Sequence, residues 1–183
     1  MNMRNEGSSS ELVRRDKRHV LSILVPSYNE QATLERCIDR VRAIENDTLG
    51  LEIIIIDDCS ENRSREIAQQ LAAKFDNVHV LLHSVNQGKG AAIHTGIKAA
   101  TGDFVAIQDA DLEYNPQDLL RLVVPLIEDE AEVAIGSRFF LARHPSSALF
   151  LAHHGQSVPN VLVEHVYRPE PNRHGNVLQS LSP

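Results

Sequence analysis

Short apolar runs alternate with longer amphipathic stretches along most of the chain. Runs rich in β-branched residues predict five strands, at 21–25, 51–56, 78–82, 104–107 and 133–135. Apolar positions spaced three and four apart predict four helices, at 31–44, 63–75, 89–100 and 117–127. Asn115 followed by Pro116 predicts an N-cap and a first helical residue for the last of these helices.

Regular alternation of strands and helices predicts an α/β fold, with a mostly parallel sheet covered by helices on both faces. In the first helix one apolar stripe is expected to face the sheet, made of Leu34, Ile38, Val41 and Ile44. Ligands of such sheets bind at the carboxyl ends of the strands. The residues that follow each predicted strand are therefore the place to look for chemistry.

Four of the five predicted strands end in polar segments, which read PSYNE at 26–30, DDCS at 57–60, NQGKG at 86–90 and DADLE at 109–113. A parallel sheet would bring these segments to one rim. We therefore expect a single binding site built from all four.

The last of these segments has the residues for a metal site. Asp109 and Asp111 are two apart in an extended segment, so both carboxylates project the same way, and Glu113 shares their parity. Carboxylate oxygens suit Mg²⁺ or Mn²⁺, which would screen a substrate pyrophosphate. The alternative is an acidic strand-to-helix turn without a metal.

The other segments suggest a nucleotide. Lys89 stands between glycines at a helix start, where N–H groups and the helix dipole favour an anion, although the spacing is not that of a Walker loop. Asp57 and Asp58 offer acceptors for a base N–H or for ribose hydroxyls, or else a charge for the next helix. Tyr28 can stack on a base or pack in the core.

Arg138 follows the last predicted strand and can pair with a phosphate or lie on the surface without a role. The four histidines before residue 141 lack the spacing of metal ligands, and we assign them no function. They are His19, His79, His83 and His94.

The overall composition limits the class of protein. With 183 residues, 42% of them apolar, and a net charge of −7, the chain can form one globular domain and lacks the basic balance of a nucleic-acid-binding protein. Its longest aliphatic run, 53–56, is too short to cross a bilayer. Two cysteines and no apolar leader predict a cytoplasmic protein, peripheral at most on the cytoplasmic face of the membrane.

Composition also divides the chain into three parts. Residues 1–19 are polar and charged and predict a disordered arm, and 20–140 hold the predicted α/β domain. Residues 141–183 contain five of the eight prolines and five of the nine histidines, but no Asp or Lys. We expect this tail to pack poorly.

The four rim segments, in this order and followed by Gly-Ser-Arg, resemble the family 2 glycosyltransferases over residues 21–139, especially the branch that makes dolichyl- or polyprenyl-phosphate sugars. The resemblance implies a Rossmann-like GT-A domain that binds a nucleoside diphosphate sugar such as GDP-mannose or UDP-glucose. It implies nucleotide contacts by Pro26, Tyr28, Glu30 and Asp57, with Asp58 and Lys89 beside them. It further implies a DxD motif at Asp109 and Asp111, metal ligation by Asp111 and Glu113, and a phosphate contact by Arg138.

The resemblance also implies the acceptor, a polyprenyl phosphate at a membrane surface whose anionic oxygen attacks the anomeric carbon with inversion. Such an acceptor has little need of a general base, and the catalytic set would be Asp109, Asp111 and Arg138. Two alternatives remain: an inactive nucleotide-sugar-binding remnant, or a receiver-like phosphotransfer domain that uses Asp57, Asp58 and Asp109.

The family pattern stops near Phe140, so the fold is expected to be incomplete on the acceptor side. With suitable codons, residues 164–177 shifted by one base read NMFTDLNLTDMET, which resembles the family segment missing here. Our hypothesis is a one-base frameshift near 140–144, which makes the tail an out-of-frame product. The alternative is a genuine divergent tail, and the gene sequence around codons 139–145 distinguishes the two.

Overall fold

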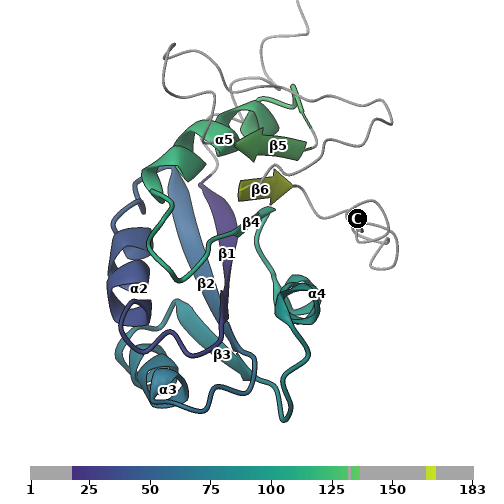
Figure 1. Cartoon of the computed structure of the whole chain (residues 1–183). Helices are drawn as coiled ribbons and strands as arrows, with labels where there is room; N and C mark the ends of the chain where they lie inside the picture. Colours follow the sequence, from purple (N-terminus) through teal and green to yellow (C-terminus); the bar gives the residue numbers. More distant parts are fainter. Residues whose placement is uncertain (1–17, 132, 137–163, 168–183) are drawn as a thin grey trace, which may run out of the picture.

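The computed structural model describes residues 18–131, 133–136 and 164–167 (Figure 1). The strands are β1 (His19–Ser27), β2 (Leu49–Asp57), β3 (Val78–Leu82), β4 (Phe104–Ile107), β5 (Val133–Gly136) and β6 (Glu164–Tyr167). The helices are α2 (Leu34–Arg42), α3 (Ser64–Lys74), α4 (Lys89–Ala99) and α5 (Gln117–Ile127). The alternation predicted from the sequence is confirmed.

The described strands form one sheet in the order β3-β2-β1-β4-β6-β5. β1 to β4 are mutually parallel, and β6 runs antiparallel to both β4 and β5. β1 and β2 are in register up to the pair Ser27 and Asp57, so their carboxyl ends lie side by side. From β1 the chain first adds strands on one side, β2 and then β3, and afterwards adds β4 on the other side. An open α/β sheet binds its ligands at the point where the order of strands changes in this way.

Helices cover both faces of this sheet, α2 and α3 on one side and α4 on the other (Figure 1). The larger core contains the buried residues of α2, α3 and α5, and the smaller core packs Ala92 of α4 on β1, β2 and β4. Because β2 is covered on both faces, its isoleucines 53–56 are all at most 2% exposed. The predicted apolar stripe is buried as expected, with three of its residues on α2 and the fourth, Ile44, just beyond the end of the helix at Arg42.

Several boundaries differ from the prediction for local reasons. β1 begins at His19, inside the predicted arm, because the His19 N–H donates to the Thr48 carbonyl at 3.0 Å. α2 begins at Leu34, because the preceding residues form a turn that closes on the Glu30 carbonyl. The N-cap of α5 is Pro116, one residue later than predicted.

The predicted tail lies almost wholly outside the described residues. Residues 1–17 of the predicted arm also lie outside them. Within the tail the structure describes β6, whose backbone pairs with Val105 and Ala106 of β4 and with β5. Part of the segment that the sequence analysis separated from the domain thus belongs to the sheet. The frameshift hypothesis stays a prediction for the gene sequence to test.

Gly102 should resist replacement by any residue with a side chain. An added Cβ would lie 2.7 Å from the Val20 carbonyl oxygen and 2.6 Å from the Ser22 Oγ. Ser22 is itself fixed, because its hydroxyl accepts from the Gly102 N–H and donates to Glu52. We expect Gly102→Ala to lower the free energy of unfolding by about 1–3 kcal/mol, measured by urea denaturation.

Gly90→Ala is the matched control, because a Cβ at that position in α4 meets no atom within 4 Å. There alanine should stabilise the helix by at most about 1 kcal/mol. Equal stability of the Gly102→Ala protein and the wild type would contradict the close contact described.

Candidate functional site

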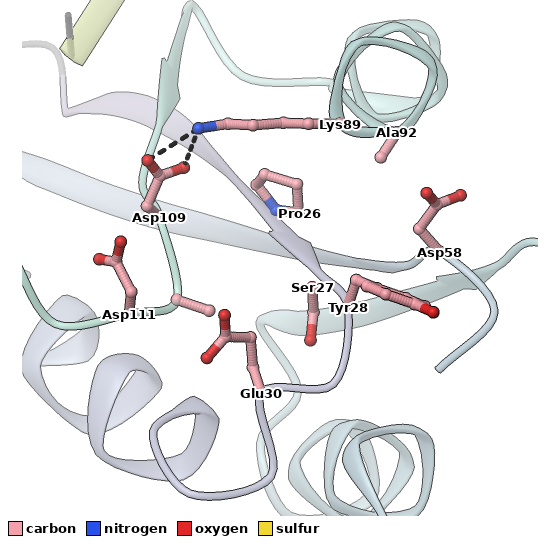
Figure 2. A pocket seen from close by; sticks show the side chains of 10 residues that line it. Pro26, Ser27, Tyr28, Glu30, Asp58, Lys89, Ala92, Asp109 and Asp111 are labelled. Carbon is pink, nitrogen blue, oxygen red and sulfur yellow. Dashed lines mark hydrogen bonds and ion pairs between the residues drawn. The ribbon is translucent and has the colours of Figure 1, made fainter. Parts of the chain in front are cut away.

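A pocket of about 210 Å³ opens at the carboxyl ends of β1, β2 and β4, beside the start of α4 (Figure 2). It is lined by Pro26, Ser27, Tyr28, Glu30, Asp58, Lys89, Ala92, Asp109, Ala110 and Asp111. Seven of these are residues that the sequence analysis placed at the site, and they come from all four rim segments. Ser27, Ala92 and Ala110 are additional; Ser27 and Ala110 lie inside predicted segments.

Three predicted site residues are not part of this lining. Asp57 is fully buried next to the pocket, where its Oδ2 accepts from the Arg65 Nε at 3.1 Å and from the Ser60 N–H at 3.2 Å. Its Oδ1 is buried without a hydrogen-bond partner in the described structure. Glu113 is exposed outside the lining, and Arg138 lies outside the described residues.

An ion pair crosses the pocket from α4 to the end of β4 (Figure 2). The Lys89 Nζ lies 2.6 Å from Oδ1 and 2.8 Å from Oδ2 of Asp109. The Lys89 side chain is 53% exposed, so solvent screens the pair and its contribution to stability is small. Its importance is geometric, since it places a cation and a carboxylate in contact inside the cavity.

Asp58 joins the end of β2 to the start of α4. Its Oδ1 accepts from the Gln87 N–H at 2.9 Å and its Oδ2 from the Gly88 N–H at 2.7 Å. Burial by itself raises the Asp58 pKa, but these two bonds and the bond to His83 outweigh it and hold the pKa below its ordinary value of 3.8. The sequence predicted that a ligand anion would bind at this helix start. The two N–H groups before α4 instead bind the carboxylate of Asp58.

His83, to which the sequence pattern assigns no role, is the third partner of the Asp58 carboxylate. The ring is buried, with Nδ1 2.6 Å from Asp58 Oδ1 and Nε2 2.9 Å from Thr95 Oγ1. Because Asp58 is ionised, Nδ1 must donate to it. The missed signal was position, since His83 directly follows β3 at the same carboxyl edge as the other segments.

The loops after β1 and β2 are joined to each other by hydrogen bonds at Asn29, the residue after Tyr28. The Asn29 N–H donates to Ser60 Oγ at 3.0 Å, and the Glu61 N–H donates to Asn29 Oδ1 at 2.9 Å. Asn29 and Cys59 both have left-handed backbones, with φ of 60° and 61°. Tyr28 is 44% exposed at the pocket, so its ring is accessible for stacking and the core-packing alternative is wrong.

The oxygen donors of the pocket suit a hard divalent cation that takes part of its coordination from a ligand. Asp109 and Asp111 line the cavity together, and Asp111 Oδ1 is oriented by the Glu113 N–H at 3.0 Å. Across residues 18–131, 133–136 and 164–167, however, no three His, Cys, Asp or Glu side chains converge as a preformed metal cluster. Two carboxylates completed by substrate phosphates and water is the usual arrangement for Mg²⁺.

Most of the chain is similar to known proteins. The model of Glycosyl transferase family 2 matches residues 22–147. The chain is 36% identical over 121 residues to a dolichol-phosphate mannosyltransferase of Pyrococcus furiosus, covering 65% of this chain and 33% of the relative. The chain spans about a third of the length of the curated relatives it matches.

Solved structures share the fold. A mannosyltransferase of Pyrobaculum calidifontis in complex with GDP-Man and Mn²⁺ superposes with a TM-score of 0.53 and 27% identity, covering 66% of this chain and 35% of that one. A glucosyl-3-phosphoglycerate synthase of Mycobacterium tuberculosis with Mn²⁺ and uridine diphosphate gives a TM-score of 0.54 and 26% identity, covering 75% and 50%. The fold is thus the Rossmann-like GT-A fold, and the chain belongs to glycosyl transferase family 2.

Proposed function

We propose that this chain binds a nucleoside diphosphate sugar in the pocket described and is the donor half of an enzyme that transfers the sugar to a polyprenyl phosphate. The observation that carries the proposal is the content of the cavity: an accessible Tyr28 ring at one wall and the Asp109 and Asp111 carboxylates at the other. A stacking surface opposite hard oxygen ligands fits a nucleotide whose diphosphate is held through a cation.

The residues have distinct roles in this proposal. Tyr28 stacks on the base, and Pro26 and Glu30, which also line the pocket, are proposed as further nucleotide contacts. Asp57 is proposed to support the nucleotide site from behind the lining, because its side chain is 0% exposed and its Oδ2 holds the Arg65 Nε and the Ser60 N–H. Asp58 acts indirectly, because both of its oxygens already hold the start of α4.

Asp109 and Asp111 would hold Mg²⁺ or Mn²⁺, with Glu113 as a further ligand. Such a cation, when bound, screens the diphosphate and stabilises the leaving nucleoside diphosphate. Lys89 lies against Asp109 and supplies a second positive charge to the same phosphates. Arg138 is proposed as a further phosphate contact.

The acceptor is proposed from the relative's name and from chemistry. The Pyrococcus furiosus relative is a dolichol-phosphate mannosyltransferase. A lipid phosphate is already anionic at neutral pH, so it can attack the anomeric carbon with inversion without a basic side chain beside it. The described helices include none that is long and apolar enough to span a bilayer.

The receiver-like alternative fits the structure less well. It needs Asp57, Asp58 and Asp109 to share one accessible acidic pocket. Asp57 is 0% exposed and paired with Arg65, and both oxygens of Asp58 are hydrogen-bonded, which leaves only Asp109 of the three for a phosphodonor.

Calorimetry tests the proposed function. The full chain should bind GDP-mannose or UDP-glucose in the presence of Mn²⁺ and lose this binding when EDTA removes the cation. Transfer of labelled sugar to a polyprenyl phosphate in detergent is then measured on the same preparation. Absence of binding to either donor overturns the proposal, and normal binding without transfer identifies the inactive remnant.

A further inference from the structure

Arg40 links helix α2 to the loop that carries the candidate metal ligands. Its guanidinium donates from Nη1 to the Leu112 carbonyl at 3.3 Å and from Nη2 to Asn115 Oδ1 at 3.5 Å. We propose that Arg40 is a positioning residue, which fixes this loop so that Asp111 presents its carboxylate to the cation. This inference rests on the proposed function, because it assigns Arg40 a role at the same site.

The loop needs such support because its backbone is unfavourable where Arg40 contacts it. Leu112 has a φ of 67°, a left-handed conformation that costs a bulky residue roughly 1–2 kcal/mol. This conformation lies directly between the two predicted ligands Asp111 and Glu113. The Glu113 N–H donates to Asp111 Oδ1 at 3.0 Å, so the orientation of the Asp111 carboxylate depends on the same turn.

Arg40 holds the loop at two points with one rigid, planar group. Asn115 Oδ1, its second acceptor, also accepts from the Gln117 N–H at 3.4 Å, at the first residue of α5. The guanidinium therefore joins α2, the left-handed turn and the start of α5. A lysine has a single ammonium group and cannot reproduce this fork.

The positive charge of Arg40 opposes the binding of a cation. A geometric role of Arg40 and a purely electrostatic one therefore predict opposite effects of its replacement. The guanidinium donates to the carbonyl of Leu112, the residue directly after Asp111, so its positive charge lies at the loop that carries the candidate ligands. A positive charge so placed repels a metal ion, so Arg40 can favour binding only through the geometry it imposes.

Mn²⁺ binding to the full chain, without nucleotide, provides the test. The signal of free Mn²⁺ in electron paramagnetic resonance gives the affinity for the wild type, Arg40→Lys and Arg40→Gln. Loss of an outer-shell contact typically lowers metal affinity 10- to 100-fold, and we expect at least about a 10-fold loss in both variants. Arg36→Gln, on the exposed face of the same helix, is the matched control and should leave the affinity unchanged.

The two possible roles of Arg40 predict opposite changes in Mn²⁺ affinity for Arg40→Gln. A purely electrostatic role predicts tighter binding by Arg40→Gln and unchanged binding by Arg40→Lys, and either result overturns the inference. Circular dichroism checks the fold, and if Arg40→Gln does not fold, Arg40→Lys decides the question because it keeps the charge. Failure of the wild type to bind Mn²⁺ overturns the proposed metal site itself, whereas wild-type binding with an unaffected Arg40→Lys overturns only the role of Arg40.

Discussion

Replacing Asp111 with asparagine will remove cation-dependent binding of the donor nucleotide, with a fall in affinity of about 100-fold or more in the presence of Mn²⁺. The reason is the contrast between the two carboxylates of the pocket. Asp109 is partly neutralised by Lys89, 2.6 Å away, whereas Asp111 is exposed and oriented by the Glu113 N–H. Asparagine keeps the shape of the side chain and removes the charge that attracts the cation.

The measurement is calorimetric titration of the nucleotide sugar with and without Mn²⁺. Asp76→Asn is the matched control, because Asp76 lies exposed in the turn before β3, at the edge of the parallel sheet opposite the carboxyl ends that form the pocket. Its binding should equal that of the wild type. Equal Mn²⁺-dependent affinities for Asp111→Asn and the wild type would show that the cation is held elsewhere or not required.

Replacing Asp58 with alanine will destabilise the protein by about 3 kcal/mol, the largest effect on folding that we expect from a polar residue here. The carboxylate is buried and accepts from two backbone N–H groups and His83. Alanine would leave the buried His83 Nδ1 without this partner and would release the two backbone N–H groups before α4, and an unsatisfied buried donor costs free energy. Urea denaturation measures the loss.

The contribution of the Asp58 charge also depends on pH in a defined direction. Its pKa in the folded protein lies below the ordinary value of 3.8, so ionised Asp58 favours the folded state. The stabilisation is complete above the unfolded pKa and disappears as the pH falls through the lower, folded pKa. The difference in stability between wild type and Asp58→Asn should therefore be constant near neutral pH and shrink in acid below about pH 4.

Asp47→Ala is the matched control for Asp58, because Asp47 is an exposed loop residue before β2. It should change the free energy of unfolding by less than about 0.5 kcal/mol at any pH. A similarly small loss for Asp58→Ala would mean that the bonds to the start of α4 do not stabilise the fold.

The order and type of the elements in the domain followed from local pattern. β3 and β4 have the bounds that the sequence predicts, because apolar periodicity and the flanking polar residues define both of their ends. The antiparallel strand β6 was missed, because Glu164–Tyr167 is a four-residue strand in a proline-rich segment. Its place between β4 and β5 depends on pairing with strands distant in the sequence.

The lining of the site was predicted better than the roles of its residues. A parallel sheet brings strand ends together whatever the side chains are, so Tyr28, Lys89 and Asp111 could be assigned to one rim from the sequence. The inward position of Asp57 and the hydrogen bonds of Asp58 could not be assigned, because adjacent acidic residues look alike in a sequence.

The sequence by itself determined the alternation of strands and helices, the rim on which polar segments meet, and the family, because each depends on short-range periodicity and on motifs a few residues long. Only the tertiary structure decided which polar groups face the cavity and which hold the chain around it. His83 and Arg40 bond to residues 25 and 72 positions away. Such contacts arise from packing between elements, and no local pattern encodes them.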